Sequence, residues 1–171
     1  MLLLTLFACG GPETSSDDTG GGRPVRAPNV VINEFLASND TVNVDEAGEY
    51  DDWVELYNAG DTAVDFAGLY LTDDRETAPT RWPLPEGGLQ PGEFALFWAD
   101  DTPDQGTAHM NFKLAREGDQ ISLTFVSGGA DPVLVDAVVY EKQAADLSYA
   151  RVPDGSLEWV QGTPTPDASN G

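Results

Sequence analysis

The chain has 171 residues, of which 30 are Asp or Glu and 8 are Lys or Arg, and its formal net charge is −22. This charge argues against a nucleic-acid partner, because binding to phosphates depends on clustered Lys and Arg side chains. A single cysteine excludes an internal disulfide framework, a single histidine excludes a multi-histidine zinc site, and 18 Gly with 12 Pro indicate many turns.

The first nine residues form an apolar segment that is too short to span a bilayer and that ends at Cys9. Leu6-Phe-Ala-Cys9 resembles a bacterial lipoprotein box, which implies that the Cys9 thiol carries a lipid anchor. The alternative is an ordinary secretory signal and a secreted protein. Gly10 and Gly11 do not resemble an inner-membrane retention signal, so an outer-membrane lipoprotein is expected.

Residues 10–28 are rich in Gly, Ser, Thr and Asp, which predicts a disordered tether between the anchor and a folded domain. Residues 29–171 alternate short apolar runs with turn residues, which predicts one β domain. The expected strands are 30–36, 53–58, 63–66, 69–72, 81–84, 94–98, 108–114, 120–125, 133–140, 147–152 and 157–160.

Two of these runs are weaker strand predictions, so about eight or nine strands are expected. Pro83 makes 81–84 irregular, and 108–114 has little alternation. Residues 94–98 are apolar at every position, which predicts a central strand. Only 141–146 has a helical tendency, and it is too short to persist alone.

Short turns without helical crossovers require antiparallel pairing, and two packed sheets satisfy it economically. A closed barrel is the structural alternative. The residues expected in the core are Ile32, Leu56, Leu96, Phe97, Ile121, Leu123 and Val135. The four tryptophans at 53, 82, 98 and 159 are expected mostly inside, with Trp82 the most exposed because Arg81 and Pro83 flank it.

Several segments in order resemble the lamin tail domain as it occurs in bacteria. They are VINEF (31–35), DWVELYN (52–58), LYLTD (69–73), WPLP (82–85), LQPGEF (89–94), NFKL (111–114), GDQISL (118–123) and SYARVPDG (148–155). The resemblance runs from Val30 to the end of the chain. It implies an all-β, immunoglobulin-like antiparallel β-sandwich of the kind that occurs in secreted and surface proteins, alone or appended to enzymes.

The densest group of carboxylates precedes the strand 53–58. It comprises Asp45, Glu46, Glu49, Asp51 and Asp52. Calcium prefers six to eight oxygen ligands, so this loop is a candidate for an irregular calcium site, and calcium is the one cofactor that the sequence suggests. An EF-hand is excluded, because Val54 stands where a bidentate Glu is required. The preferred interpretation is a plain solvated acidic loop that binds no ion.

A second polar group lies inside apolar strands. Asn33, Glu34 and Glu55 are predicted to be buried, and two-residue alternation places Glu34 beside Ile32. Family resemblance makes Arg151 their expected ion-pair partner. A structural role is preferred, and the alternative is a hydrolase that uses Glu34 and Glu55 as a glycosidase-like carboxylate pair.

His109 has no Ser or Cys motif beside it and is expected at a strand end. The chain is therefore expected to be a lipid-anchored protein of the bacterial cell envelope. Its sandwich would serve as a non-catalytic interaction or adhesion module for a protein or glycan. Nucleic-acid binding by analogy with nuclear lamin tails conflicts with the charge of −22.

Overall fold

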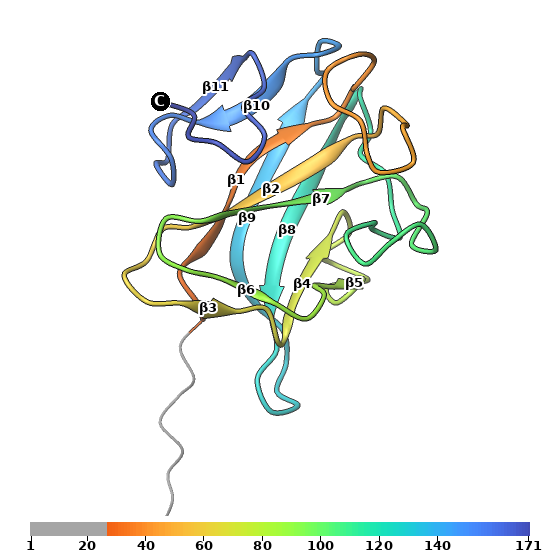
Figure 1. Ribbon diagram of the computed structural model, residues 1–171. Coiled ribbons are helices and arrows are strands. Elements are labelled where there is room, and N and C mark those ends of the chain that lie inside the picture. Colours follow the sequence, from red (N-terminus) through yellow and green to blue (C-terminus); the bar gives the residue numbers. More distant parts are fainter. Residues whose placement is uncertain (1–26) are drawn as a thin grey trace, which may run out of the picture.

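A computed structural model describes residues 27–171, which form eleven β-strands and no helix (Figure 1). The strands are β1 (Val30–Leu36), β2 (Trp53–Asn58), β3 (Val64–Asp65), β4 (Leu69–Thr72), β5 (Trp82–Pro83), β6 (Gly88–Leu89), β7 (Phe94–Trp98), β8 (Gly118–Phe125), β9 (Val133–Glu141), β10 (Ser148–Arg151) and β11 (Trp159–Gly162). A helix long and apolar enough to cross a membrane does not occur in this part of the chain.

Two sheets face each other, and all paired strands within them are antiparallel (Figure 1). The first has the order β11-β10-β1-β2-β7 and the second the order β5-β4-β8-β9, with a small β3-β6 pair beside them. The predicted immunoglobulin-like β-sandwich is therefore confirmed. The barrel alternative is wrong, because the two large sheets are separate and each has two edge strands.

The main core lies between the two large sheets. Five of the predicted core residues are at most 3% exposed, namely Ile32, Leu56, Phe97, Ile121 and Leu123. Leu96 and Val135 are only partly buried. Leu96 packs on a small second cluster made by Leu36, Trp53 and Trp98. Val135 is the extra residue where the β8-β9 register shifts, and it packs against the main core while remaining partly exposed.

The expectation that 94–98 is a central strand is wrong, because β7 is the edge of its sheet. The run is apolar on both faces because Phe97 faces the main core while Leu96 and Trp98 join the second cluster. Residues 108–114 form no strand and contribute only isolated bridges at His109 and Lys113. Residues 141–146 form no helix, since β9 continues to Glu141.

The expected exposure of Trp82 is also wrong. Trp82 is 6% exposed and meets Phe97 edge-on with ring centroids 5.3 Å apart. Pro83, its neighbour on β5, carries the exposed position instead. Trp159 is the half-buried tryptophan, stacked on Tyr149.

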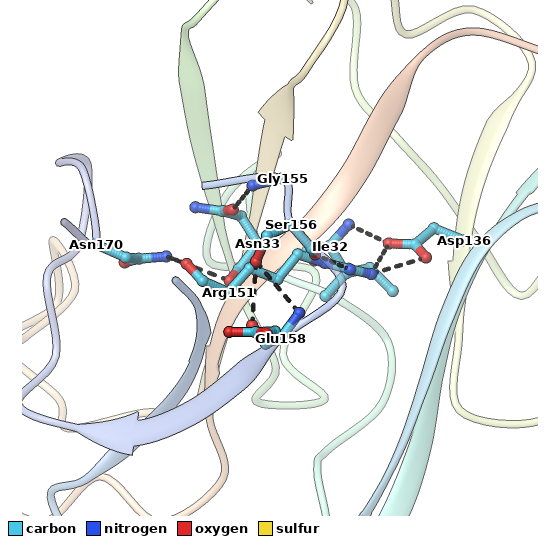
Figure 2. A network of polar contacts seen from close by, with 8 residues as sticks. All are labelled: Ile32, Asn33, Asp136, Arg151, Gly155, Ser156, Glu158 and Asn170. Atoms are coloured by element: carbon cyan, nitrogen blue, oxygen red, sulfur yellow. Dashed lines mark hydrogen bonds and ion pairs between the residues drawn. The ribbon is translucent and has the colours of Figure 1, made fainter. Parts of the chain in front are cut away.

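Arg151 and Asp136 join the two sheets at the side of β1 (Figure 2). The NH2 nitrogen of Arg151 in β10 donates to the Asp136 carboxylate of β9 and lies 2.9 and 3.0 Å from its two oxygens. The same pair satisfies the backbone of Ile32: Asp136 accepts from its N–H at 2.8 Å, and the Arg151 Nε donates to its carbonyl at 2.8 Å. One largely buried ion pair and the backbone of one residue of β1 thus link the two sheets.

Replacing Asp136 with Ala is expected to lower the free energy of unfolding by about 3–5 kcal/mol, because it leaves the Arg151 charge buried without its partner. Denaturation in urea measures this loss. The matched control is Glu117→Gln, which removes one member of the exposed Lys142–Glu117 pair and should change stability little. Equal stability of the two variants would show that the buried pair does not hold the sheets together.

Candidate functional site

The acidic loop before β2 folds around the side chain of Asp45, which is 7% exposed. Asp45 Oδ1 accepts the N–H of Glu49 at 2.8 Å, and the Asp45 N–H donates to the Glu49 carbonyl at 3.0 Å. Gly48 completes this turn at φ 82°, a left-handed conformation that glycine adopts without strain. The turn brings carboxylate oxygens of Asp45, Glu49 and Asp51 within 4.8 Å of one another.

A second loop, residues 99–109, closes over the first. Oxygen atoms of Asp45 and Asp100 and a ring nitrogen of His109 also lie within 4.8 Å of one another, and all three residues are buried. Gln105 donates from Nε2 to Glu49 at 2.7 Å. Gly106 lies close to the Glu46 side chain, and a Cβ at this position would lie only 3.0 Å from Glu46 Oε1. The two loops therefore form one site, which we call the Asp45–His109 cluster: Asp45, Glu46, Glu49, Asp51, Asp100 and His109.

His109 has no exposed surface and uses its two ring nitrogens differently. Nδ1 lies 2.5 Å from Asp100 Oδ2 in a hydrogen bond. Nε2 lies 3.2 Å from Glu46 Oε1, but without the alignment of a hydrogen bond. Burial lowers the pKa of His109, yet the hydrogen bond to Asp100 and the charge of Glu46 outweigh it, so this pKa is raised.

The carboxylates of the cluster affect one another electrostatically. The pKa of Asp51 is raised, first by burial and then by the negative charges of Asp100, Asp45 and Glu49. The pKa of Asp100 is lowered, because hydrogen bonds from Thr102 and His109 together outweigh its burial. Negative charge is therefore crowded at this junction of two loops.

Of the five candidate calcium ligands, the structure brings Asp45, Glu49 and Asp51 together and places Glu46 beside His109. Asp52 is directed elsewhere: its Oδ1 accepts the N–H of Asn39 at 3.0 Å, and burial raises its pKa to about 6. No sequence pattern joins Asp100 and His109 to this loop, since they follow it by about fifty residues. The one available signal was that the chain has a single histidine.

Glu34 and Glu55 form a second buried polar site, on the outer face of the first sheet. They face each other across β1 and β2, and neither has exposed surface. The segment 163–170 covers them: Thr165 donates its N–H to Glu34 at 3.0 Å, and Asp167 donates its N–H to Glu55 at 2.6 Å. Burial is the largest cause that raises the pKa of both groups, to about 8 for Glu55.

The placement of Glu34 beside Ile32 is wrong, because β1 has a bulge at Asn33. The extra residue leaves Ile32 in the main core and turns Glu34 to the outer face. The Asn33 side chain itself accepts the Gly155 N–H at 3.0 Å (Figure 2). It also donates to Asp154 at 3.0 Å.

The predicted pairing of Arg151 with Glu34 or Glu55 is wrong as well. Arg151 pairs with Asp136, and its NH1 also donates to the Ser156 carbonyl (Figure 2). Asp136 belongs to β9 in the opposite sheet, a placement that the strand pattern of the sequence does not reveal. The two glutamates are therefore held by backbone N–H groups and the Thr165 hydroxyl.

In a comparison with protein families, the model described as Lamin Tail Domain matches residues 24–142. A search of curated proteins and a search of solved structures each gave no match. The match ends before β10 and β11, so Arg151 and the segment over Glu34 and Glu55 follow the matched region. The lipidation site expected at Cys9 and the tether at 10–28 lie outside the described residues, except for 27 and 28.

The burial of Glu55 predicts a pH dependence of stability. Its pKa in the folded protein is about 8 against 4.5 as the ordinary value, so its neutral form favours folding. The stability that the neutral Glu55 contributes is fully present below the ordinary pKa of 4.5 and is lost as the pH rises through about 8. We expect Glu55→Gln, which keeps the acceptor for Asp167 and cannot ionise, to weaken this loss.

Urea denaturation at a series of pH values measures the effect. Between about pH 5 and about pH 8, the unfolding free energy of the wild type should fall more steeply than that of Glu55→Gln, by at most about 1.4 kcal/mol per pH unit. Glu86→Gln, at an exposed position, should behave as the wild type. Parallel curves for all three proteins would contradict the raised pKa.

Proposed function

Because the chain belongs to the lamin tail domain family, we propose that it is a bacterial cell-envelope protein whose sandwich binds another molecule and carries out no reaction. Domains of this family are immunoglobulin-like and typically serve as interaction modules, and the family is not a known family of enzymes. The partner is a protein or a glycan of the envelope. The strong negative charge of the chain favours a partner with basic groups.

The observation that carries the non-catalytic proposal is the burial of Glu34 and Glu55. A hydrolase needs its carboxylates within hydrogen-bond reach of a substrate and of water. These two have no exposed surface, and their oxygens accept hydrogen bonds from the segment 163–170. A raised pKa suits a general acid, but here its cause is burial inside a structural layer. The geometry therefore supports an anchoring role for the pair.

We propose that binding involves two exposed apolar side chains, one associated with each of the two large sheets. Val139 is 79% exposed on β9, an edge strand, and lies in a shallow depression lined by residues 117–120 and 139–142. Leu157 is 90% exposed in the turn between β10 and β11. Exposed apolar groups beside open strand edges are common sites of association.

If Val139 and Leu157 contact the partner, the substitutions Val139→Glu and Leu157→Glu should abolish capture of an envelope component while the fold is kept. The measurement is chemical cross-linking in intact cells followed by affinity purification of the full chain. Thr62→Glu is the matched control, since it adds the same charge at another exposed position. Capture that is equal for all variants would place the binding surface elsewhere.

Attachment to the envelope is proposed to occur through Cys9. The support is sequence evidence: a small residue at Ala8 precedes the cysteine, and a Gly- and Ser-rich stretch follows it. Two or more acyl chains give stable membrane attachment, at about 0.8 kcal/mol per buried methylene. The outer membrane is the destination that we propose, with secretion as the alternative.

Lipidation predicts that the full chain expressed in a bacterium incorporates labelled fatty acid and partitions into detergent. Cys9→Ser should lose both properties, because the hydroxyl does not accept the lipid from the lipoprotein pathway. Ser15→Ala, a substitution in the adjoining stretch, should keep both. Unlabelled wild-type protein in the soluble fraction would contradict the anchor and favour secretion.

A further inference from the structure

The Asp45–His109 cluster contains polar atoms that are buried without a hydrogen-bond partner among the described residues. They are Asp45 Oδ2, Asp51 Oδ2 and His109 Nε2. Buried polar atoms of this kind are rare, and each calls for an explanation such as an ion or an ordered water. Asp45 is 7% exposed and His109 is fully buried, so bulk solvent does not supply the missing contacts.

The residues that carry these unpartnered atoms lie close together. Asp45 is shared by two triads, one with Glu49 and Asp51 and one with Asp100 and His109, and within each triad the ligand atoms lie within 4.8 Å of one another. Ligands of a single metal ion have comparable separations, because each lies about 2.0–2.6 Å from the ion. Glu46 Oε1 lies 3.2 Å from His109 Nε2 without a hydrogen bond, a separation that one ion between them would explain.

The hydrogen bond from Asp100 selects which ring nitrogen is available. It engages His109 Nδ1 at 2.5 Å and leaves Nε2 as the free nitrogen. This is the arrangement in which a carboxylate orients a metal-binding histidine and fixes its tautomer. Asp100 is therefore a positioning residue, and Thr102 holds it in turn by donating its backbone N–H to Oδ1 at 3.1 Å.

We propose that the cluster binds one divalent ion of the zinc type, with His109 Nε2, Asp45 and Glu46 as ligands. Calcium prefers oxygen ligands, whereas an imidazole nitrogen suits zinc and related transition metals. Because His109 is part of the cluster, a zinc-type ion is expected here in place of the calcium that the acidic loop alone suggested. Asp51 and Glu49 add negative charge beside the ligands. Glu46 and Glu49 are exposed, which gives the ion a path from solvent.

An ion at this place joins the loop at 45–51 to the loop at 99–109. In the described structure, one side-chain hydrogen bond, from Gln105 to Glu49, and one ion pair, of His109 with Glu46, link these loops. The ion would neutralise part of the crowded charge and fix the outer face of the first sheet, where Trp53 donates to Asn43 of the acidic loop at 2.9 Å. The inference is independent of the envelope anchor and of the binding partner.

The single histidine makes a direct test possible without any mutation. In full-length protein labelled with 15N-histidine, all imidazole signals come from His109. Addition of Zn2+ is expected to shift the Nε2 signal strongly and the Nδ1 signal weakly, and Ca2+ is expected to shift neither strongly. No zinc-dependent shift, a shift of Nδ1 in place of Nε2, or equal responses to Zn2+ and Ca2+ would each overturn the proposal.

Calorimetric titration with Zn2+ tests the oxygen ligands. Asp45→Asn should weaken binding at least tenfold, and Asp100→Asn should weaken it about 10–100-fold through the orientation of His109. Asp131→Asn is the matched control, because it removes the same charge at an exposed position in the β8-β9 turn. Circular dichroism confirms that each variant is folded. Asp45→Asn and Asp131→Asn proteins with the affinity of the wild type would overturn the assignment of Asp45.

Discussion

The contact between Arg151 and Asp136 is the constraint on which the sandwich depends. β10 pairs with β1 only at Glu34 and Phe35, so the edge of β1 before the bulge lacks a neighbouring strand on that side. An unpaired backbone inside a protein is costly. Asp136 and Arg151 supply the missing acceptor and donor to Ile32, and they do so from opposite sheets (Figure 2). One ion pair therefore satisfies the strand and closes the sandwich.

On the outer face of the first sheet, two buried carboxylates likewise accept hydrogen bonds from backbone groups. Glu34 and Glu55 cost free energy to bury, and the N–H groups of Thr165 and Asp167 offset part of that cost. Asn33, the buried extra residue of the bulge, binds the turn at Asp154 and Gly155. Residues after the family match thus complete a sheet that the matched region begins. The polar layer gives the C-terminal segment a defined position.

Part of the negative charge of the protein is concentrated where the acidic loop meets the loop at 99–109. Among residues 27–171, most carboxylates are exposed, as expected for a protein with a net charge of −22. Asp45, Asp51 and Asp100 differ because they are buried or half-buried and act on one another. The placement of His109 among them separates this cluster from an ordinary acidic loop.

The sequence by itself determined the class of fold and the main strands. The runs 30–36, 53–58 and 69–72 have the same bounds in the structure, because the alternation of apolar and polar residues is local to each strand. The acidic loop was also visible, since all its members lie within eight residues. The order of the segments was enough to identify the family.

Tertiary structure decided everything that depends on register and on contacts across the sheets. The bulge at Asn33 reversed the face of Glu34. The strand order placed β7 at a sheet edge, and the second cluster covers its other apolar face. Arg151 met Asp136, and His109 met Asp45, only because the chain folds back over many residues. Local periodicity contains no information on such pairings, because they arise from the free energy of the whole packed arrangement.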